Sequence, residues 1–110
     1  MQAVIGLGAN LGDPVQAVRR ALADLAGLPR TRVVVASSLY RTTPVEASGP
    51  DFVNAVAVVE TGLPAPDLLR ALQTLEQGAG RERPFRHAPR TLDLDLLLYG
   101  EARKIGRAHV

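Results

Sequence analysis

The sequence contains no cysteine, no tryptophan and a single lysine, Lys104. Without cysteine the protein has no disulfide, no thiolate nucleophile and no Cys-ligated zinc, so packing must stabilise the fold. A glycine-rich loop with a Walker lysine is excluded as well. No apolar run approaches the roughly 20 residues that span a bilayer, and no basic segment precedes the first apolar residues. We therefore expect one cytoplasmic domain that does not contact a membrane.

The positive charge of the chain is concentrated at its C-terminus. The net charge is +2, but omitting Lys104 and Arg107 leaves 11 basic residues against 11 acidic ones. Residues 104–110 lack periodicity and resemble the translation of a sequencing adapter, so we interpret them as a non-native tail after a domain at 1–103. A native, disordered terminus is the alternative. A neutral domain with two Phe and two Tyr argues against a nucleic-acid partner.

Hydrophobic periodicity predicts strands and helices in the order βαββαβ. Strands are expected at 2–7, at 31–39 with an extension to 45, at 52–60 and around 92–96, and helices at 14–26 and 65–78. Two strands follow each other without an intervening helix, which disfavours a doubly wound parallel sheet. The order predicts an α+β, ferredoxin-like sandwich with two helices on one face of a mainly antiparallel sheet.

Three glycines, Gly6, Gly8 and Gly12, follow the first apolar run. Their spacing does not match a dinucleotide-binding fingerprint, and Asp13 would repel a phosphate. We interpret the segment as a strand-to-helix turn, with Asp13 as the helix N-cap and Pro14 at the first helical position.

Leucine and aspartate alternate from Leu92 to Leu96. Alternate residues of a strand point the same way and lie about 6.6–7 Å apart, so Asp93 and Asp95 can converge on one divalent cation. The preceding segment is cationic, with Arg81, Arg83, Arg86 and Arg90. Arginines attract polyanions, whereas carboxylates repel them unless a metal ion lies between. The two kinds of side chain together therefore predict a phosphate ligand that is bound through a metal. A solvated arginine loop beside a half-exposed strand is the alternative.

Asn54 is the one uncharged polar residue inside the expected strand 52–60. It could satisfy a local backbone group or contact a ligand, and the sequence supports both interpretations equally.

Four blocks of the sequence resemble the 6-hydroxymethyl-7,8-dihydropterin pyrophosphokinases, in order and at similar spacing. The signature block is Pro89-Arg90-Thr91-Leu92-Asp93-Leu94-Asp95, and the others are 8–12, 37–44 and 51–55. Enzymes of this family transfer pyrophosphate from ATP to the hydroxymethyl group of a reduced pterin and release AMP, in folate biosynthesis. The resemblance implies the same reaction here, in a protein that we expect to be a monomer.

The resemblance also implies roles for individual residues. Catalytic roles fall to Arg81, Arg83, Asp93 and Asp95, and the two aspartates would hold two Mg²⁺ ions. The pterin would be bound by Thr42, Thr43, Pro44, Val45, Phe52 and Asn54. ATP, the co-substrate, would be bound by Gln73, Glu76, Arg83, Arg90 and Leu96.

The chain departs from the family pattern in two respects. His87 stands where many members carry tryptophan, so its role is open. The chain also ends before a His- and Arg-containing segment of the family, from which we expect this fragment to have weak or absent activity. A non-catalytic module that binds Mg²⁺ and nucleotide is the alternative.

Overall fold

The computed structural model describes residues 1–44, 49–80, 92–100 and 106–107. These residues form eight elements, β1 (Gln2–Ala9), α1 (Pro14–Ala26), β2 (Thr31–Ala36), β3 (Tyr40–Thr42), β4 (Phe52–Thr61), α2 (Ala65–Gly80), β5 (Asp93–Tyr99) and β6 (Gly106–Arg107).

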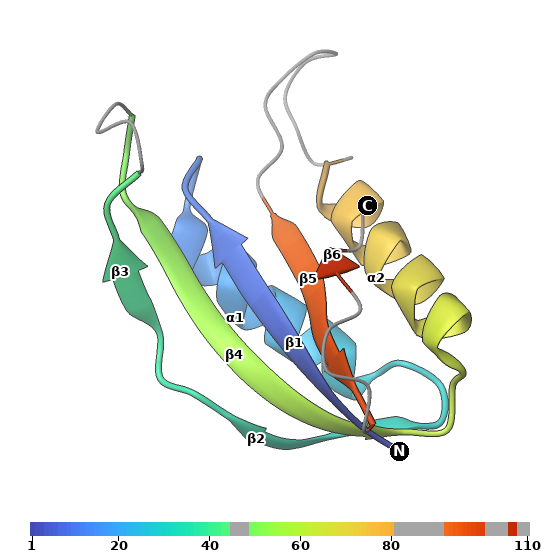
Figure 1. The fold of residues 1–110 in the computed structure, drawn as a ribbon. Helices are drawn as coiled ribbons and strands as arrows, with labels where there is room; N and C mark the ends of the chain where they lie inside the picture. The colour runs from blue at the N-terminus through green and yellow to red at the C-terminus, as the bar shows by residue number, and fades with distance from the viewer. Residues whose placement is uncertain (45–48, 81–91, 101–105, 108–110) are drawn as a thin grey trace.

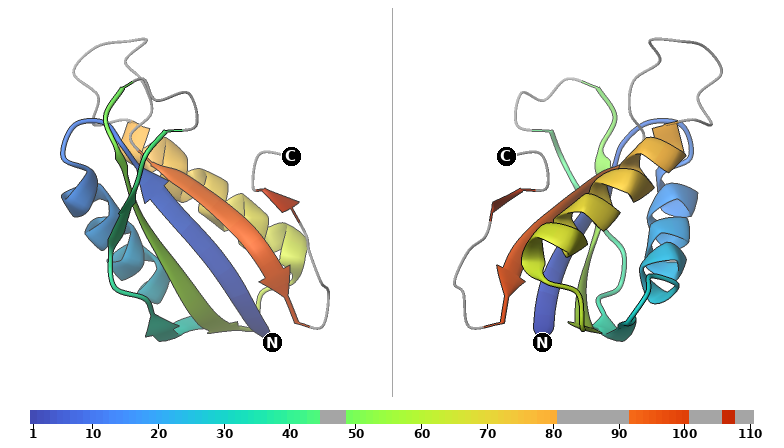
Figure 2. Two further views of the ribbon diagram at one scale, coloured as in Figure 1. Left: turned by 60° about the vertical axis from the view of Figure 1, so that its left-hand side comes forward. Right: turned by 90° about the vertical axis from the view of Figure 1, so that its right-hand side faces the viewer.

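The strands form one six-stranded sheet in the order β2-β4-β1-β5-β6, with β3 also paired to β4. Every pairing between described strands is antiparallel. Both helices cover the same face of the sheet, as Figures 1 and 2 show. The opposite face, called here the open face, carries no helix among the described residues. This arrangement confirms the α+β, ferredoxin-like prediction.

The core lies between the helices and one face of the three central strands. Alternate residues of each strand point into it, and the two helices contribute a leucine- and valine-rich stripe; the largest fully buried side chains include Ile5, Leu94, Leu96, Val53, Val59, Val18, Leu25, Leu68 and Leu72. The residues that alternate with these buried ones along each strand therefore point to the open face. Neither described helix has the length and apolar character needed to cross a membrane.

The helix start predicted at Asp13 is confirmed. The Asp13 carboxylate accepts a hydrogen bond of 3.2 Å from the Gln16 N–H, and Pro14 occupies the first turn. Gly12, with φ of 66°, makes the left-handed turn that precedes the cap. Gly6 and Gly8, predicted in this turn, instead lie within β1, which extends to Ala9.

Two strand predictions were wrong in detail. The expected strand 31–45 is divided into β2 and β3, and β2 contains a register shift between Val33 and Val35 against β4. Burial on both faces was expected at the centre of 52–60, but only alternate residues of β4 are fully buried. The helices cover one face of the sheet only, so the second face of this central strand stays half-buried. Gly106 and Arg107 pair with β5, and the non-native origin of 104–110 stays a prediction.

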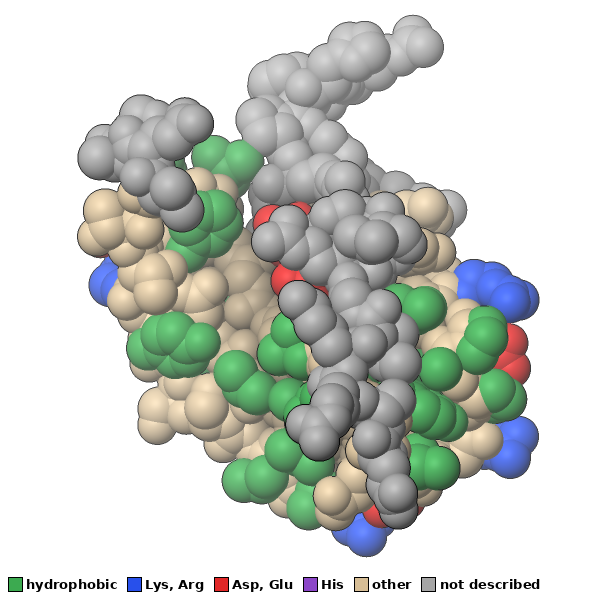
Figure 3. Space-filling model, in the orientation of Figure 1, with side chains coloured by type: hydrophobic (Ala, Val, Ile, Leu, Met, Phe, Trp, Pro, Cys, Tyr) green, Lys and Arg blue, Asp and Glu red, His purple; other side chains and the backbone are tan. Residues whose placement is uncertain are grey.

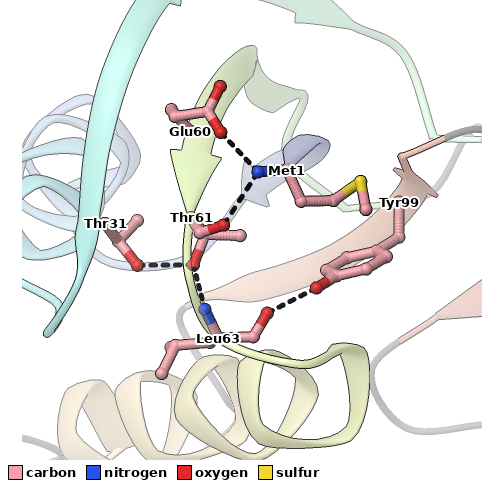
Figure 4. A network of polar contacts seen from close by, with 6 residues as sticks. All are labelled: Met1, Thr31, Glu60, Thr61, Leu63 and Tyr99. Atoms are coloured by element: carbon pink, nitrogen blue, oxygen red, sulfur yellow. Dashed lines mark hydrogen bonds and ion pairs between the residues drawn. The ribbon is translucent and has the colours of Figure 1, made fainter.

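A polar network ties the start of β1 to the ends of β4 and β5 (Figure 4). The Met1 ammonium contacts the Glu60 carboxylate and donates to the Thr61 carbonyl at 3.1 Å. The Thr61 hydroxyl lies 2.7 Å from that of Thr31 and accepts the Leu63 N–H at 3.1 Å. The Tyr99 hydroxyl donates to the Leu63 carbonyl. The network holds together chain segments that are far apart in sequence.

Thr61 is the buried centre of this network, with 2% of its surface exposed. We expect Thr61→Val to lower the free energy of unfolding by about 1–3 kcal/mol, because it removes the acceptor of the part-buried Leu63 N–H and the hydrogen bond to the Thr31 hydroxyl. Thr74→Val is the matched control, since its hydroxyl bonds within α2 at an exposed position and should change stability by less than about 0.5 kcal/mol. Urea unfolding measures the free energy of unfolding of both variants. Equal decreases in the two variants would contradict the prediction.

Candidate active site

A cavity of about 440 Å³ lies on the open face, where β1 ends and β4 and β5 begin. It is lined by residues of β1, β3, β4 and β5 and of the segment after β3, namely Gly6, Leu7, Gly8, Tyr40, Thr42, Thr43, Pro44, Phe52, Asn54, Ala55, Val56, Asp93, Asp95 and Leu97. The cavity therefore brings together five of the six predicted pterin-binding residues and both predicted metal ligands.

The pairing register explains why these residues meet. Gly8 of β1 lies opposite both Asn54 of β4 and Asp93 of β5, and Gly6 lies opposite Val56 and Asp95. Neighbouring strands are about 4.8 Å apart, so Asn54 and Asp93 face each other across a gap of roughly 10 Å with only a glycine between them. The missing side chains of β1 create a flat hollow between an amide and a carboxylate.

The two glycines are site residues that the sequence analysis missed. A Cβ atom at Gly8 would lie 3.2 Å from Asn54 Oδ1, and one at Gly6 would lie 3.4 Å from a Leu97 methyl carbon. Their spacing of two was a usable signal, because it is the period of a strand face and not of a turn. Tyr40 and Leu97 also line the cavity and were not predicted.

The Asn54 side chain links β3 to β4 and also lines the cavity. Its Nδ2 donates to the Thr42 hydroxyl at 2.9 Å and to the Tyr40 carbonyl at 3.4 Å, which ties β3 to β4. Its Oδ1 lies on the side of Gly8, at the floor of the cavity. The amide therefore satisfies a backbone carbonyl, as the structural interpretation expected. Its oxygen is oriented toward the hollow, and a contact with a ligand stays a prediction.

Asp93 and Asp95 project from β5 on the open face, the first exposed and the second half-buried. Figure 3 shows acidic atoms on this face beside hydrophobic surface. Among the described residues no group of three or more acidic or histidine side chains could hold a metal ion. Two carboxylates on one face of a strand are ligands of the type that Mg²⁺ uses together with substrate phosphates, and a metal at this position stays a prediction.

The remaining predicted residues lie elsewhere. Gln73 and Glu76 are on α2, half-buried and buried respectively, and Leu96 is fully buried in the core; none of the three lines the cavity. The Glu76 carboxylate accepts the Leu94 N–H at 2.7 Å. Val45, Arg81, Arg83, His87 and Arg90 lie outside the described residues.

The sequence model of the 7,8-dihydro-6-hydroxymethylpterin-pyrophosphokinase family matches residues 4–110 of the chain. The chain belongs to this family. It is 48% identical over 98 residues to the 2-amino-4-hydroxy-6-hydroxymethyldihydropteridine pyrophosphokinase of Pseudomonas aeruginosa, a match that covers 88% of the chain and 60% of that protein. It is 46% identical over 99 residues to the protein of the same name from Haemophilus influenzae, covering 89% of the chain and 62% of that protein.

A third relative is a much longer protein. The chain is 38% identical over 98 residues to the folic acid synthesis protein fol1 of Schizosaccharomyces pombe, which covers 88% of the chain and 13% of that protein. The chain spans about three-fifths of the length of the two bacterial relatives. The pyrophosphokinase resemblance drawn from the four sequence blocks is confirmed.

Proposed function

We propose that the protein transfers pyrophosphate from ATP to the hydroxymethyl group of 6-hydroxymethyl-7,8-dihydropterin and releases AMP. One observation carries the proposal: a single cavity is lined by Thr42, Phe52 and Asn54 on one side and by Asp93 and Asp95 on the other. This is the arrangement that a reaction between a flat polar ring and a metal-bound polyphosphate requires. Family membership and the relatives named as this pyrophosphokinase support the same reaction.

The pterin is a flat ring system with N–H donors along its edge. Phe52, half-buried beside the cavity, would stack on the ring, and the Asn54 carbonyl oxygen would accept from the ring edge. The segment of Thr42, Thr43, Pro44 and Val45 would form the wall of the pocket. Because Thr42 holds the Asn54 Nδ2, the amide cannot easily rotate to present a donor, so the pocket prefers a ligand that donates at this point.

The ATP side requires a counter-charge to the triphosphate. Asp93 and Asp95 would hold Mg²⁺, in two ions by the family pattern, and the metal would neutralise phosphate charge and align the attacking and leaving oxygens. Arg81 and Arg83 would place permanent positive charge near the transferred group without exchanging protons. Gln73, Glu76, Arg90 and Leu96 would contribute to ATP binding.

A coupled assay for AMP formation tests the proposal. With ATP, Mg²⁺ and 6-hydroxymethyl-7,8-dihydropterin, we expect AMP formation that depends on the pterin. AMP formation that is independent of the pterin would contradict the proposed acceptor. Binding of Mg²⁺ and nucleotide with no turnover at any chain concentration would favour the non-catalytic module instead.

We also propose that the protein acts as a cytoplasmic monomer. The described lining of the cavity comes from four strands and one connecting segment of a single chain, which is the arrangement expected of a monomeric enzyme. Sedimentation equilibrium at micromolar concentration would measure the oligomeric state directly.

A further inference from the structure

Glu76 is a buried carboxylate on the helical side of the sheet. It has 4% of its surface exposed, and one of its oxygens, Oε2, accepts the Leu94 N–H at 2.7 Å. A carboxyl group is rarely buried to this extent unless it is paired or hydrogen-bonded, and losing the partner of a buried N–H is costly. The contact is therefore a firm anchor between α2 and β5.

The anchored residue lies between the two aspartates of the site. Leu94 is fully buried on the helical side, while Asp93 and Asp95 point to the open face. On its other edge β5 pairs with β1, Asp93 opposite Gly8 and Asp95 opposite Gly6. The backbone between the two aspartates is thus held by strand pairing on one side and by the Glu76 side chain on the other.

Leu94 lies opposite Leu7 of β1, but on the other edge of β5 the pairing between described strands does not provide this anchor. The described pairing of β6 with β5 involves Asp95 and Leu96, so it does not reach Leu94. Glu76 supplies the acceptor that a neighbouring strand would normally supply. α2 lies alongside β5 in the views of Figures 1 and 2, which is the position that this contact requires.

We propose that Glu76 is a positioning residue: through the Leu94 amide it fixes the backbone that aims Asp93 and Asp95 at a common cation. This inference rests on the proposed function, because it assumes that the two aspartates bind a metal. It assigns Glu76 a role that does not depend on contact with ATP. Loss of the acceptor would leave the Asp93–Asp95 segment freer to move and would weaken metal binding without removing a ligand.

Titration of ¹⁵N-labelled chain with Mn²⁺ alone separates this role from ATP binding. In the wild-type chain, Mn²⁺ should broaden the amide signals of residues 93–95. Glu76→Leu should weaken the apparent Mn²⁺ affinity on the order of 10-fold, in the range seen when an outer-shell partner is removed, and should accelerate hydrogen exchange at Leu94. Glu76→Gln, which keeps an acceptor oxygen, should stay within about 3-fold of the wild type on both measures.

Two further variants control for folding. Leu25→Ala removes a fully buried side chain of α1, which packs on β1, β2 and β4; it should destabilise the fold by about 2–5 kcal/mol and leave Mn²⁺ affinity unchanged. Glu76→Asp retracts the carboxylate by one methylene and should weaken Mn²⁺ binding even if Glu76→Leu does not fold.

The outcomes separate the inference from the function on which it rests. Wild-type Mn²⁺ affinity in folded Glu76→Leu, or in Glu76→Asp should the leucine variant not fold, would overturn the positioning role alone. An equal loss of affinity in Glu76→Gln or in Leu25→Ala would overturn it as well. A wild-type chain that shows no Mn²⁺ effect at residues 93–95 would instead refute the metal site and, with it, the inference.

Discussion

Replacing Asp93 and Asp95 together by asparagine is expected to abolish the Mg²⁺-dependent part of nucleotide binding. The two carboxylates are the acidic residues that line the cavity, and asparagine keeps their size while removing the charge. Each charge-assisted contact is worth about 1.5–3 kcal/mol, so a single substitution should weaken affinity roughly 10- to 100-fold and the pair by more. Calorimetry with a non-hydrolysable ATP analogue, with and without Mg²⁺, measures this effect.

Asp24→Asn is the matched control for this charge removal. Asp24 is exposed on α1, on the helical side of the sheet, so its substitution should leave Mg²⁺-dependent binding unchanged within about 2-fold. Nucleotide binding that persists in the double variant and still responds to Mg²⁺ would show that the metal is held elsewhere. Equal losses in the Asp24 control would indicate a general effect of net charge.

Local patterns predicted the elements of this fold well. The helix at 14–26 has the predicted bounds, because the Asp13 side chain caps its start and Pro14 occupies its first turn. The Leu-Asp alternation of β5 placed Leu94 and Leu96 in the core and both aspartates on the other face. Both inferences use residues within one turn or one strand, where neighbouring residues alone determine the local backbone conformation and the side to which each side chain points.

The hollow of the cavity was not predictable in this way. It depends on Gly8 lying opposite Asn54 and Asp93, and this register is set by the packing of three strands that are distant in sequence. Gly6 and Gly8 were assigned to a turn because glycine is typical of turns. Their spacing of two was the local sign that β1 continues to Ala9, but it could not show which residues of β4 and β5 lie opposite them. The break between β2 and β3 was missed for the same reason, since both strands take their register from β4.

The contact between Glu76 and Leu94 was likewise not predictable from local patterns. The periodicity of α2 placed Glu76 at the flank of an apolar stripe, and family resemblance suggested ATP as its partner. The contact between the Glu76 carboxylate and the Leu94 N–H joins two segments that are separated in the sequence by the arginine-rich residues 81–90. No pattern within either segment could have indicated this contact. The resemblance implied a role for Glu76 in ATP binding, which stays a prediction, and the structure shows a backbone partner for it.

Filling the hollow should separate ligand binding from folding, and Gly8→Val is the variant that does so. Gly8 lies within β1 and does not have a positive φ, and valine favours strands, so the backbone should accept it. Its Cβ would lie 3.2 Å from Asn54 Oδ1, and its methyl groups would occupy the space between Asn54 and Asp93. We expect the affinity for 6-hydroxymethyl-7,8-dihydropterin to fall on the order of 100-fold, since overpacking a ligand site costs about 1–3 kcal/mol and buries the Asn54 oxygen as well.

Gly78→Ala provides the comparison on the other side of the sheet. Gly78 is exposed on α2, and a Cβ there meets nothing within 4 Å, so this variant should gain about 0.5–1 kcal/mol of stability and bind the pterin normally. Pterin fluorescence titration and thermal unfolding of both variants give the two readouts. A Gly8→Val chain that folds and still binds the pterin with wild-type affinity would exclude the hollow between Asn54 and Asp93 as the pterin site. If affinity falls while the unfolding temperature stays within a few degrees, the missing side chain at position 8 is required for binding and not for folding.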